Sequence, residues 1–517
     1  MTAATQAPPS PLRAASTAPL TTARLLWLEL RHNAMPRILP LIAVLFWFDS
    51  YRPSITQSPV WVLRTFWNMG QGHTIIDFGP FVAGVAAWMG SRDGRRAMGD
   101  LMTATARPRY LAQLVTWAAT AIWAVGGYLI FVSVMFVVYA RQGVQGSPPW
   151  WWVAVGATAV AAFSGAGFAV GALFPSRFAA PLAAFGGFLA MVMSSQTGFG
   201  ATSGWALILP TDSNGNYQPA SGTFYPYLPD LPIARIMFLA GIAVAALGLT
   251  GLPARAGGPW LRRAAAVLTV AGVAAAGTAA GLAGTARMGP HGMVISALHD
   301  AASDRPIRYT PVCGHAAGVP VCLNPAYRVY LPAVTAALRP VLGEMAGLPA
   351  APSQAAQVAA PYVAGEGEGS PVFTVGSRPP VLRMPVGALS LPGTSAFSTV
   401  ATSAGDFAGQ VRLLAVHAIV GAGAGPGTPA QQAVQAVLAL GAGVPLAAQP
   451  GILADAGLLR QGQPGSPPPA GGPGRASGSV YAAARGLAAL PAPARHAWLA
   501  AHLAALRAGW LTLAQLP

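Results

Sequence analysis

Lysine is absent from the 517-residue sequence, so all thirty basic residues are arginines. A phosphate-binding P-loop requires a lysine that reaches the nucleotide phosphates, and the chain therefore cannot carry that motif. The sequence has no His-Glu-x-x-His zinc motif, and its closest match to a nucleophile elbow, residues 401–405, lacks the first glycine. We therefore expect no catalytic, cofactor-binding or metal-binding residues, and no ordinary P-loop ATPase within this polypeptide.

Charged residues of either sign are also scarce. They make up only 9% of the chain, against 54% hydrophobic residues, whereas a soluble domain carries about 25% charged residues. The chain cannot be a single soluble globule, and we expect a multi-pass protein of the cell membrane. Its net charge of +16 would indicate nucleic-acid binding in a soluble protein, but many arginines flank apolar runs, as the positive-inside rule describes. The expected partner is thus a lipid bilayer and not a nucleic acid.

One densely charged segment, residues 91–110, lies between two long apolar runs and orients the rest of the chain. It holds five arginines, at positions 92, 95, 96, 107 and 109. Arginine-rich short loops stay in the cytoplasm during membrane insertion, so we place this loop there. Within it, residues 97–106 show helical spacing of Met98, Leu101, Met102 and Thr105, which predicts a short amphipathic helix against the membrane.

Seven apolar segments are predicted to cross the bilayer, which requires about 20 residues per helix. Before them we expect a disordered cytoplasmic tail at residues 1–22 and an interfacial helix from about residue 23. The predicted spans are residues 38–48 with extensions at either end, 73–90, 111–139, 153–174, 178–194, 234–252 and 264–286. With the amino terminus in the cytoplasm, this odd number places residue 287 onward outside the cytoplasm.

Asp77 lies within the second predicted span. An ionisable residue inside the hydrocarbon is a candidate functional site, although a position near the external interface explains Asp77 equally well. Small residues dominate the fourth span at residues 164–171, so neighbouring backbones are expected to approach closely there.

The fold class expected is an α-helical polytopic membrane domain followed by a mixed α/β extracytoplasmic domain. The membrane domain has a six-span part at residues 23–252, then an inner loop and seventh span at residues 253–286. Residues 287–517 are less apolar and have the size of one domain or two small ones. Within them we predict strands at 371–376 and 380–386, helices at 428–440 and 494–513, and a flexible Gly-, Pro- and Ser-rich linker at 461–479.

The only two cysteines, Cys313 and Cys322, lie near the start of this last domain. In an oxidising compartment a pair so spaced most often forms a disulfide. A soft metal held by Cys313, His315 and Cys322 is the alternative, but a fourth ligand is not evident and zinc prefers four. The disulfide interpretation agrees with an extracytoplasmic position.

Residues 93–107 resemble the loop between the second and third spans of type-2 ABC exporter permeases. In that family an acidic and basic start is followed by Gly-Thr-Leu-Glu-Leu-Leu-Leu-Ala-Thr-Pro and then a basic residue. Matching positions here are Leu101, Met102, Ala104, Thr105 and Arg107, whereas Ala97, Asp100 and Ala106 replace the usual Gly, Glu and Pro. The resemblance covers roughly the first half of the chain, to about residue 252.

This resemblance implies a cytoplasmic coupling helix that docks into a separate nucleotide-binding ATPase subunit, preceded by a connecting helix at about residues 22–33. ATP and Mg would then be bound by that partner subunit, and the permease would work as a homodimer or heterodimer. The residues implied in ATPase coupling are Arg92, Asp93, Arg95, Arg96, Met98, Asp100, Leu101, Met102 and Arg107. The seventh span and the external domain lie outside the six-span pattern of the family.

Two other classes of function are compatible with the sequence. A membrane anchor or sensor would bind a ligand or partner through the external domain and would not depend on an ATPase. A membrane-embedded enzyme would use Asp49, His73 and Asp77 near the outer leaflet, although interfacial positions explain these residues equally well.

Overall fold

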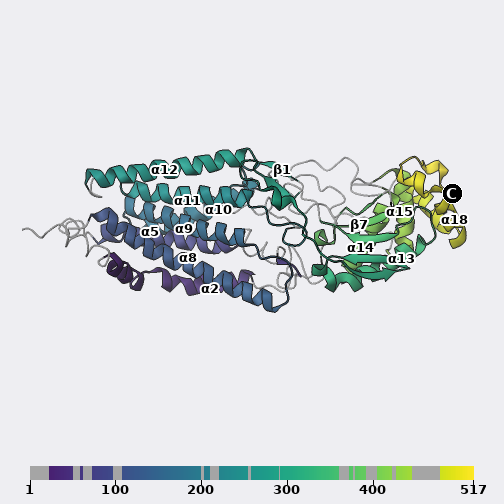
Figure 1. Cartoon of the computed structure of the whole chain (residues 1–517), viewed down its shortest axis with the longest axis horizontal. Helices are drawn as coiled ribbons and strands as arrows, with labels where there is room; N and C mark the ends of the chain where they lie inside the picture. The colour runs from purple at the N-terminus through teal and green to yellow at the C-terminus, as the bar shows by residue number, and fades with distance from the viewer. Residues whose placement is uncertain are drawn as a thin grey trace, which may run out of the picture.

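The structure is a computed structural model of the chain, and it separates into a helical bundle and a domain with a mixed sheet, at opposite ends of the longest axis (Figure 1). The residues that it describes are 22–50, 59–61, 73–96, 108–198, 203–209, 221–253, 258–289, 291–359, 372–376, 379–389, 391, 404–421, 427–444 and 478–517.

Among the residues that the structure describes, four bundle helices are long and apolar enough to cross a membrane, which is compatible with the expected membrane protein. They are α8 (Arg109–Arg141), α9 (Trp150–Leu173), α11 (Asp230–Thr250) and α12 (Pro259–Gly284). The other three predicted spans coincide with α2 (Met35–Ser50), α5 (His73–Gly90) and α10 (Ala179–Gly198), whose described apolar stretches are shorter. The layout of six spans plus one is therefore not confirmed. The 16 residues of α2 reach only about 24 Å at 1.5 Å per residue, short of a hydrocarbon core of about 30 Å.

Helix boundaries differ from the predicted ones at the bundle surface. The fourth span was predicted to begin at residue 153, but α9 begins at Trp150 and so includes three further tryptophan positions, 150–152. Pro149 immediately precedes this helix, and a proline is compatible with a helix start because its fixed φ suits the first turn. A helix is present over residues 22–31, where an interfacial helix was predicted, and its Trp27 and Leu28 are exposed.

Small residues bring bundle helices into backbone contact, as predicted for the fourth span. Gly167 and Gly171 of α9 lie against the carbonyl oxygens of Ala83 and Ala87 in α5, where a Cβ atom would collide. These positions are four apart on each helix, the spacing of a small-xxx-small interface. The fourth predicted span is thus a packing surface for the second.

The C-terminal domain is mixed α/β, which confirms the predicted class. A hairpin of β1 (Arg287–Gly289) and β2 (Gly292–Val294) precedes a five-stranded sheet of order β3-β4-β5-β7-β6. Its strands are β3 (Val312–Ala316), β4 (Val319–Leu323), β5 (Gln354–Gln357), β6 (Thr374–Val375) and β7 (Val381–Met384). The β3–β4 and β6–β7 pairs are antiparallel, whereas β5 runs parallel to β4 and β7.

Helices α13 (Leu331–Glu344) and α14 (Ala404–Val420) pack on this sheet. Farther from the sheet lie α15 (Pro429–Gly441), α17 (Gly478–Ala489) and α18 (Ala492–Arg507), toward the end of the molecule (Figure 1). The predicted strands and helices match β6, β7, α15 and α18, with the last predicted helix ending earlier, at Arg507. The final two residues of the predicted linker begin α17, and its other residues lie outside the described part of the chain.

The bundle and the C-terminal domain share a hydrophobic core at their junction. Val60, Trp152 and Phe224, from the bundle side, belong to the same buried cluster as the interior of the domain. The side-chain amide of Asn324, after β4, also donates to the Thr223 carbonyl at 3.5 Å. The domain is therefore packed onto the bundle as well as joined to it through the chain.

Candidate functional site

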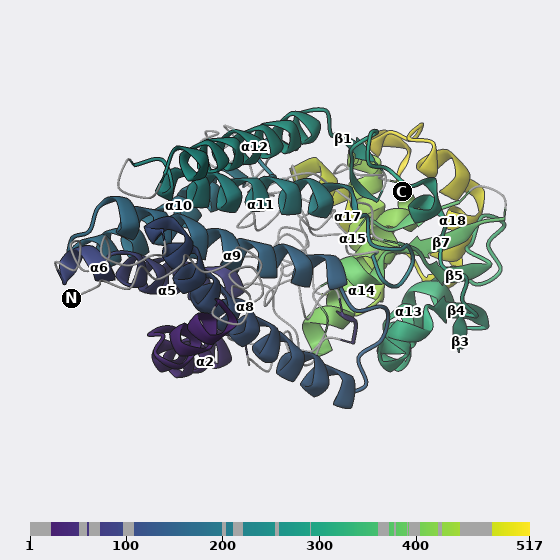
Figure 2. The same cartoon turned by 60° about the vertical axis from the view of Figure 1, so that its left-hand side comes forward.

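Residues 91–96, the described start of the arginine-rich segment, lie with α6 at the end of the bundle opposite the C-terminal domain (Figure 2). The short helix α6 (Arg92–Arg95) follows α5 after the single residue Ser91. The Ser91 amide donates to the Ala87 carbonyl, and the Arg95 amide donates to the Ser91 carbonyl. Helix α6 is therefore joined to α5 by nearly continuous helical hydrogen bonding.

Four of the predicted coupling residues, at positions 92, 93, 95 and 96, are described by the structure. The other five, together with the predicted amphipathic helix at residues 97–106, lie outside the described residues: Met98, Asp100, Leu101, Met102 and Arg107.

Arg92 forms a two-pronged ion pair with Glu29 of the 22–31 helix. Its two terminal nitrogens donate to the two carboxylate oxygens at 3.1 and 2.8 Å. The side chains are 27% and 13% exposed, so water screens this pair less than it screens a fully exposed pair. The hydrogen bond to Glu29 raises the pKa of Arg92, and the charges of Glu29 and Asp93 add to this effect against the cost of burial. Asp93 lies 3.6 Å from the same guanidinium.

Arg95 folds back onto the end of α5. Its guanidinium carbon lies 3.4 Å from the centre of the Trp88 ring, and its nitrogens donate to the Ser91 hydroxyl and the Trp88 carbonyl. Desolvation lowers the pKa of Arg95, and the charge of Arg96 adds to that effect. The sequence predicted that Arg95 and Arg96 both contact a partner subunit. Of these two, Arg96 is exposed, whereas Arg95 is half-buried because it contacts Trp88 and Ser91.

The 22–31 helix is also fastened to the third predicted span. The Trp123 indole of α8 donates to the Leu30 carbonyl at 2.9 Å. Just beyond the helix, the buried Asn33 amide donates to the Thr120 hydroxyl of α8, also at 2.9 Å. Together with the ion pair to Arg92, these bonds make the 22–31 helix a bridge between α6 and α8.

A third contact joins α6 to the turn between α9 and α10. Gly94 lies so close to the Pro175 ring that a Cβ atom at Gly94 would collide with it. Helix α6 is therefore packed against that turn and joined to α5. The end of the bundle forms one packed unit around Arg92, which we name the Arg92 hub: the 22–31 helix, α6 and residues 174–177.

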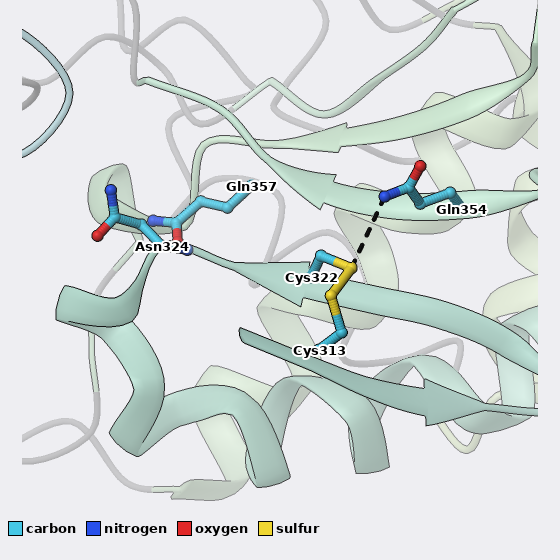
Figure 3. The surroundings of a disulfide bond; sticks show 5 residues. All are labelled: Cys313, Cys322, Asn324, Gln354 and Gln357. Carbon is cyan, nitrogen blue, oxygen red and sulfur yellow. Dashed lines mark hydrogen bonds between the residues drawn. A yellow bond between two sulfur atoms is a disulfide. The ribbon is translucent and has the colours of Figure 1, made fainter. Parts of the chain in front are cut away.

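The remaining predicted site residues lie elsewhere. Asp77 is in the first part of α5, and its side chain is outside the described residues. Cys313 and Cys322 face each other across the β3–β4 pair and form a disulfide, with Cα atoms 4.1 Å apart (Figure 3). The metal alternative is wrong for these cysteines because each sulfur is bonded to the other.

Sequence reasoning missed the residues that hold the hub together. These residues are Glu29, Trp88 and Pro175, which contact Arg92, Arg95 and Gly94. Glu29 and Pro175 are distant from α6 in sequence, and Trp88 resembles the many other tryptophans of the apolar segments. One signal was available in the sequence: Glu29 is the single acid in an otherwise basic and apolar helix. A partly buried acid is expected to pair with a cation.

No family model, curated protein or solved structure matches this chain. The resemblance to type-2 ABC exporter permeases therefore rests on the sequence pattern alone, chiefly at residues 93–107.

Proposed function

We propose that this chain is the permease subunit of an ATP-driven exporter, in which a separate ATPase subunit docks on the 91–110 segment. ATP and Mg are then bound by the ATPase, and two permeases, identical or different, form the pathway. The observation that carries the proposal is the Arg92 hub, because it connects the docking segment to several helices at once.

The hub offers a physical route from a docked ATPase to the membrane. A push on α6 moves α5 through the helical hydrogen bonds at Ser91. It moves α8 through the Arg92–Glu29 pair and the 22–31 helix. The second and third spans would thus tilt together, and the size of the change is limited by the difference in ATPase binding between the two states.

The proposal includes an orientation for the whole chain. The amino terminus and the Arg92 hub lie in the cytoplasm, seven helices cross the membrane, and residues 287–517 lie outside. The arginine content of residues 91–110 and the position of the C-terminal domain at the opposite end of the bundle (Figure 2) support this orientation. A disulfide is also favoured outside the cytoplasm.

Co-purification with a P-loop ATPase encoded by a neighbouring gene tests the proposal. Arg96→Glu reverses the charge of the exposed arginine at the end of α6 without touching the Trp88 or Glu29 contacts. It should weaken recovery of the ATPase while membrane insertion stays normal. The matched control is Arg328→Glu, an exposed arginine in η4 (Pro325–Tyr330) of the C-terminal domain, which should retain the ATPase. Equal recovery with both variants, or no ATPase with the unchanged chain, contradicts the proposal.

A membrane anchor or sensor is the second candidate, and the shared core at the junction favours it. Since Val60, Trp152 and Phe224 pack into the domain interior, ligand binding by the domain would displace bundle helices without any ATPase. This candidate predicts a working protein in the absence of a partner ATPase, which the same co-purification experiment distinguishes.

A further inference from the structure

A histidine lies between two carboxylates at the junction of the bundle and the C-terminal domain. His299 follows the β1–β2 hairpin, and its Nδ1 lies 3.1 Å from Oδ2 of Asp230, the first residue of α11. Its Nε2 lies 3.0 Å from Oδ2 of Asp304, in the short helix η3 (Ala301–Asp304). One imidazole therefore joins two elements that are distant in sequence.

The two carboxylates differ in their access to water. Asp230 is fully buried, whereas the Asp304 side chain is 50% exposed and that of His299 is 17% exposed. Oδ2 of Asp230 also accepts from the Ile295 amide at 2.8 Å, but its Oδ1 is buried with no hydrogen-bond partner. The buried carboxyl group of Asp230 is thus held by the Ile295 amide and the His299 imidazole.

The hydrogen-bond chemistry of the three groups requires an extra proton. A neutral imidazole has one N–H donor and one acceptor nitrogen, whereas an ionised carboxylate only accepts. Both ring nitrogens lie within hydrogen-bond distance of carboxylate oxygens, so neutral His299 with two carboxylates would leave one pair of acceptors facing each other. With one more proton, both contacts become hydrogen bonds, and charge assists them.

We propose that His299 is a proton-binding site that fastens the start of α11 to η3, and that release of the proton loosens this junction. The proposal goes beyond the exporter function and does not depend on it. After proton loss, the remaining N–H stays with buried Asp230, since that carboxylate has no access to water. The exposed Asp304 then turns to solvent, and η3 is released from the end of α11.

The surrounding charges agree with this assignment. From α11 the charged groups are Asp230 and Arg235, and the Nε of Arg235 donates to the Leu207 carbonyl at 2.6 Å. From η3 and its flanks they are Asp304, Arg305 and Asp300, and Asp300 caps η3 by accepting from the Ala302 amide.

The hairpin contributes Arg287 and also His291, which stacks on Tyr225 with ring centres 3.5 Å apart. The hydrogen bond to Asp304, with the charge and hydrogen bond of Asp230, raises the pKa of His299 against the cost of desolvation. The pKa of His291 is instead lowered by desolvation, which the charge of Asp304 opposes. The pKa values of the two neighbouring histidines are therefore shifted in opposite directions.

Histidine-selective NMR on the full chain in detergent micelles tests the proposal. The imidazole signal that disappears in His299→Gln identifies the residue, and its titration midpoint in the unchanged chain is expected above 6.5, the ordinary value. Asp304→Asn, at a half-exposed position, should fold and should lower that midpoint. The signal of His496 on α18, at the far end of the molecule (Figure 1), should be unaffected by the Asp304→Asn substitution and serves as the internal control.

Hydrogen exchange gives a second readout that a merely structural histidine would not produce. Amides of residues 295–304 should exchange faster, after correction for intrinsic rates, as pH rises through the His299 midpoint, and Asp304→Asn should abolish this pH dependence. A midpoint at or below 6.5 in the unchanged chain, no change in it with Asp304→Asn, or pH-independent exchange of this segment overturns the proposal.

Discussion

Gly241→Ala should push apart α11 and α12, two bundle helices whose backbones are in close contact. A Cβ atom at Gly241 would lie 2.7 Å from both the Ala276 amide nitrogen and the Gly272 carbonyl oxygen, whereas ordinary contacts begin at 3.4 Å. The helices must therefore move apart by about 0.7 Å, the difference between these two distances. Both obstructing atoms belong to the backbone, so no side-chain rotation relieves the contact.

Overpacking of this kind costs about 1 to 3 kcal/mol. A substitution of glycine by alanine in a helix without steric conflict gains up to about 1 kcal/mol from helix propensity. Gly277→Ala in α12 is the matched control, because a Cβ atom there meets nothing within 4 Å. We expect Gly241→Ala to lower the free energy of unfolding and Gly277→Ala to leave it unchanged or raise it.

The assay is SDS-driven unfolding of the purified chain in mixed micelles, followed by circular dichroism. Each variant is compared with the unchanged chain at the same micelle composition. If Gly241→Ala is as stable as Gly277→Ala, the close approach of α11 and α12 is not present in the folded protein and the packing argument is refuted.

Three further predictions concern the ion pair, the disulfide and the pH dependence of stability. Arg92→Glu should lower the free energy of unfolding of the bundle by placing two acids together. Glu29→Arg combined with Arg92→Glu should recover about 1 kcal/mol of that free energy in a double-mutant cycle. No recovery would mean that the pair does not form. After reduction with a membrane-impermeant reagent, an impermeant maleimide should label exposed Cys313 in intact cells. The disulfide closes a loop with a separation of 9 residues and should contribute about 2 to 3 kcal/mol to the free energy of unfolding. Labelling without reduction, or only in lysed cells, would contradict the first expectation. Because the folded pKa of His299 is raised, its stabilising contribution relative to His299→Gln is complete below the unfolded value of 6.5 and is lost as pH rises through the folded pKa; a difference that instead grows with pH in chemical unfolding experiments would show the opposite sign.

The candidate site was predicted only in part, and the reason lies in the range of its interactions. The run of arginines at residues 91–110 located the site, since charge between apolar runs is visible locally. The sequence did not show which of the arginines at positions 92, 95 and 96 is exposed. Arg95 stacks on Trp88, and Arg92 pairs with Glu29, which is 63 residues away along the chain. Charge patterning identifies candidates, and the packing of other helices decides which of them are exposed.

By itself the sequence determined the apolar character and approximate positions of the described bundle helices, the mixed composition of the C-terminal domain and a pair of cysteines spaced to form a disulfide. These properties follow from apolar content, periodicity and short-range spacing, each of which acts within one segment of chain. Tertiary structure alone decided the close approach of Gly241 to α12, the Arg92 hub and the contact of His299 with Asp230, 69 residues away. Such contacts depend on the angle and register at which helices meet, and those are set by the packing of all the side chains between them.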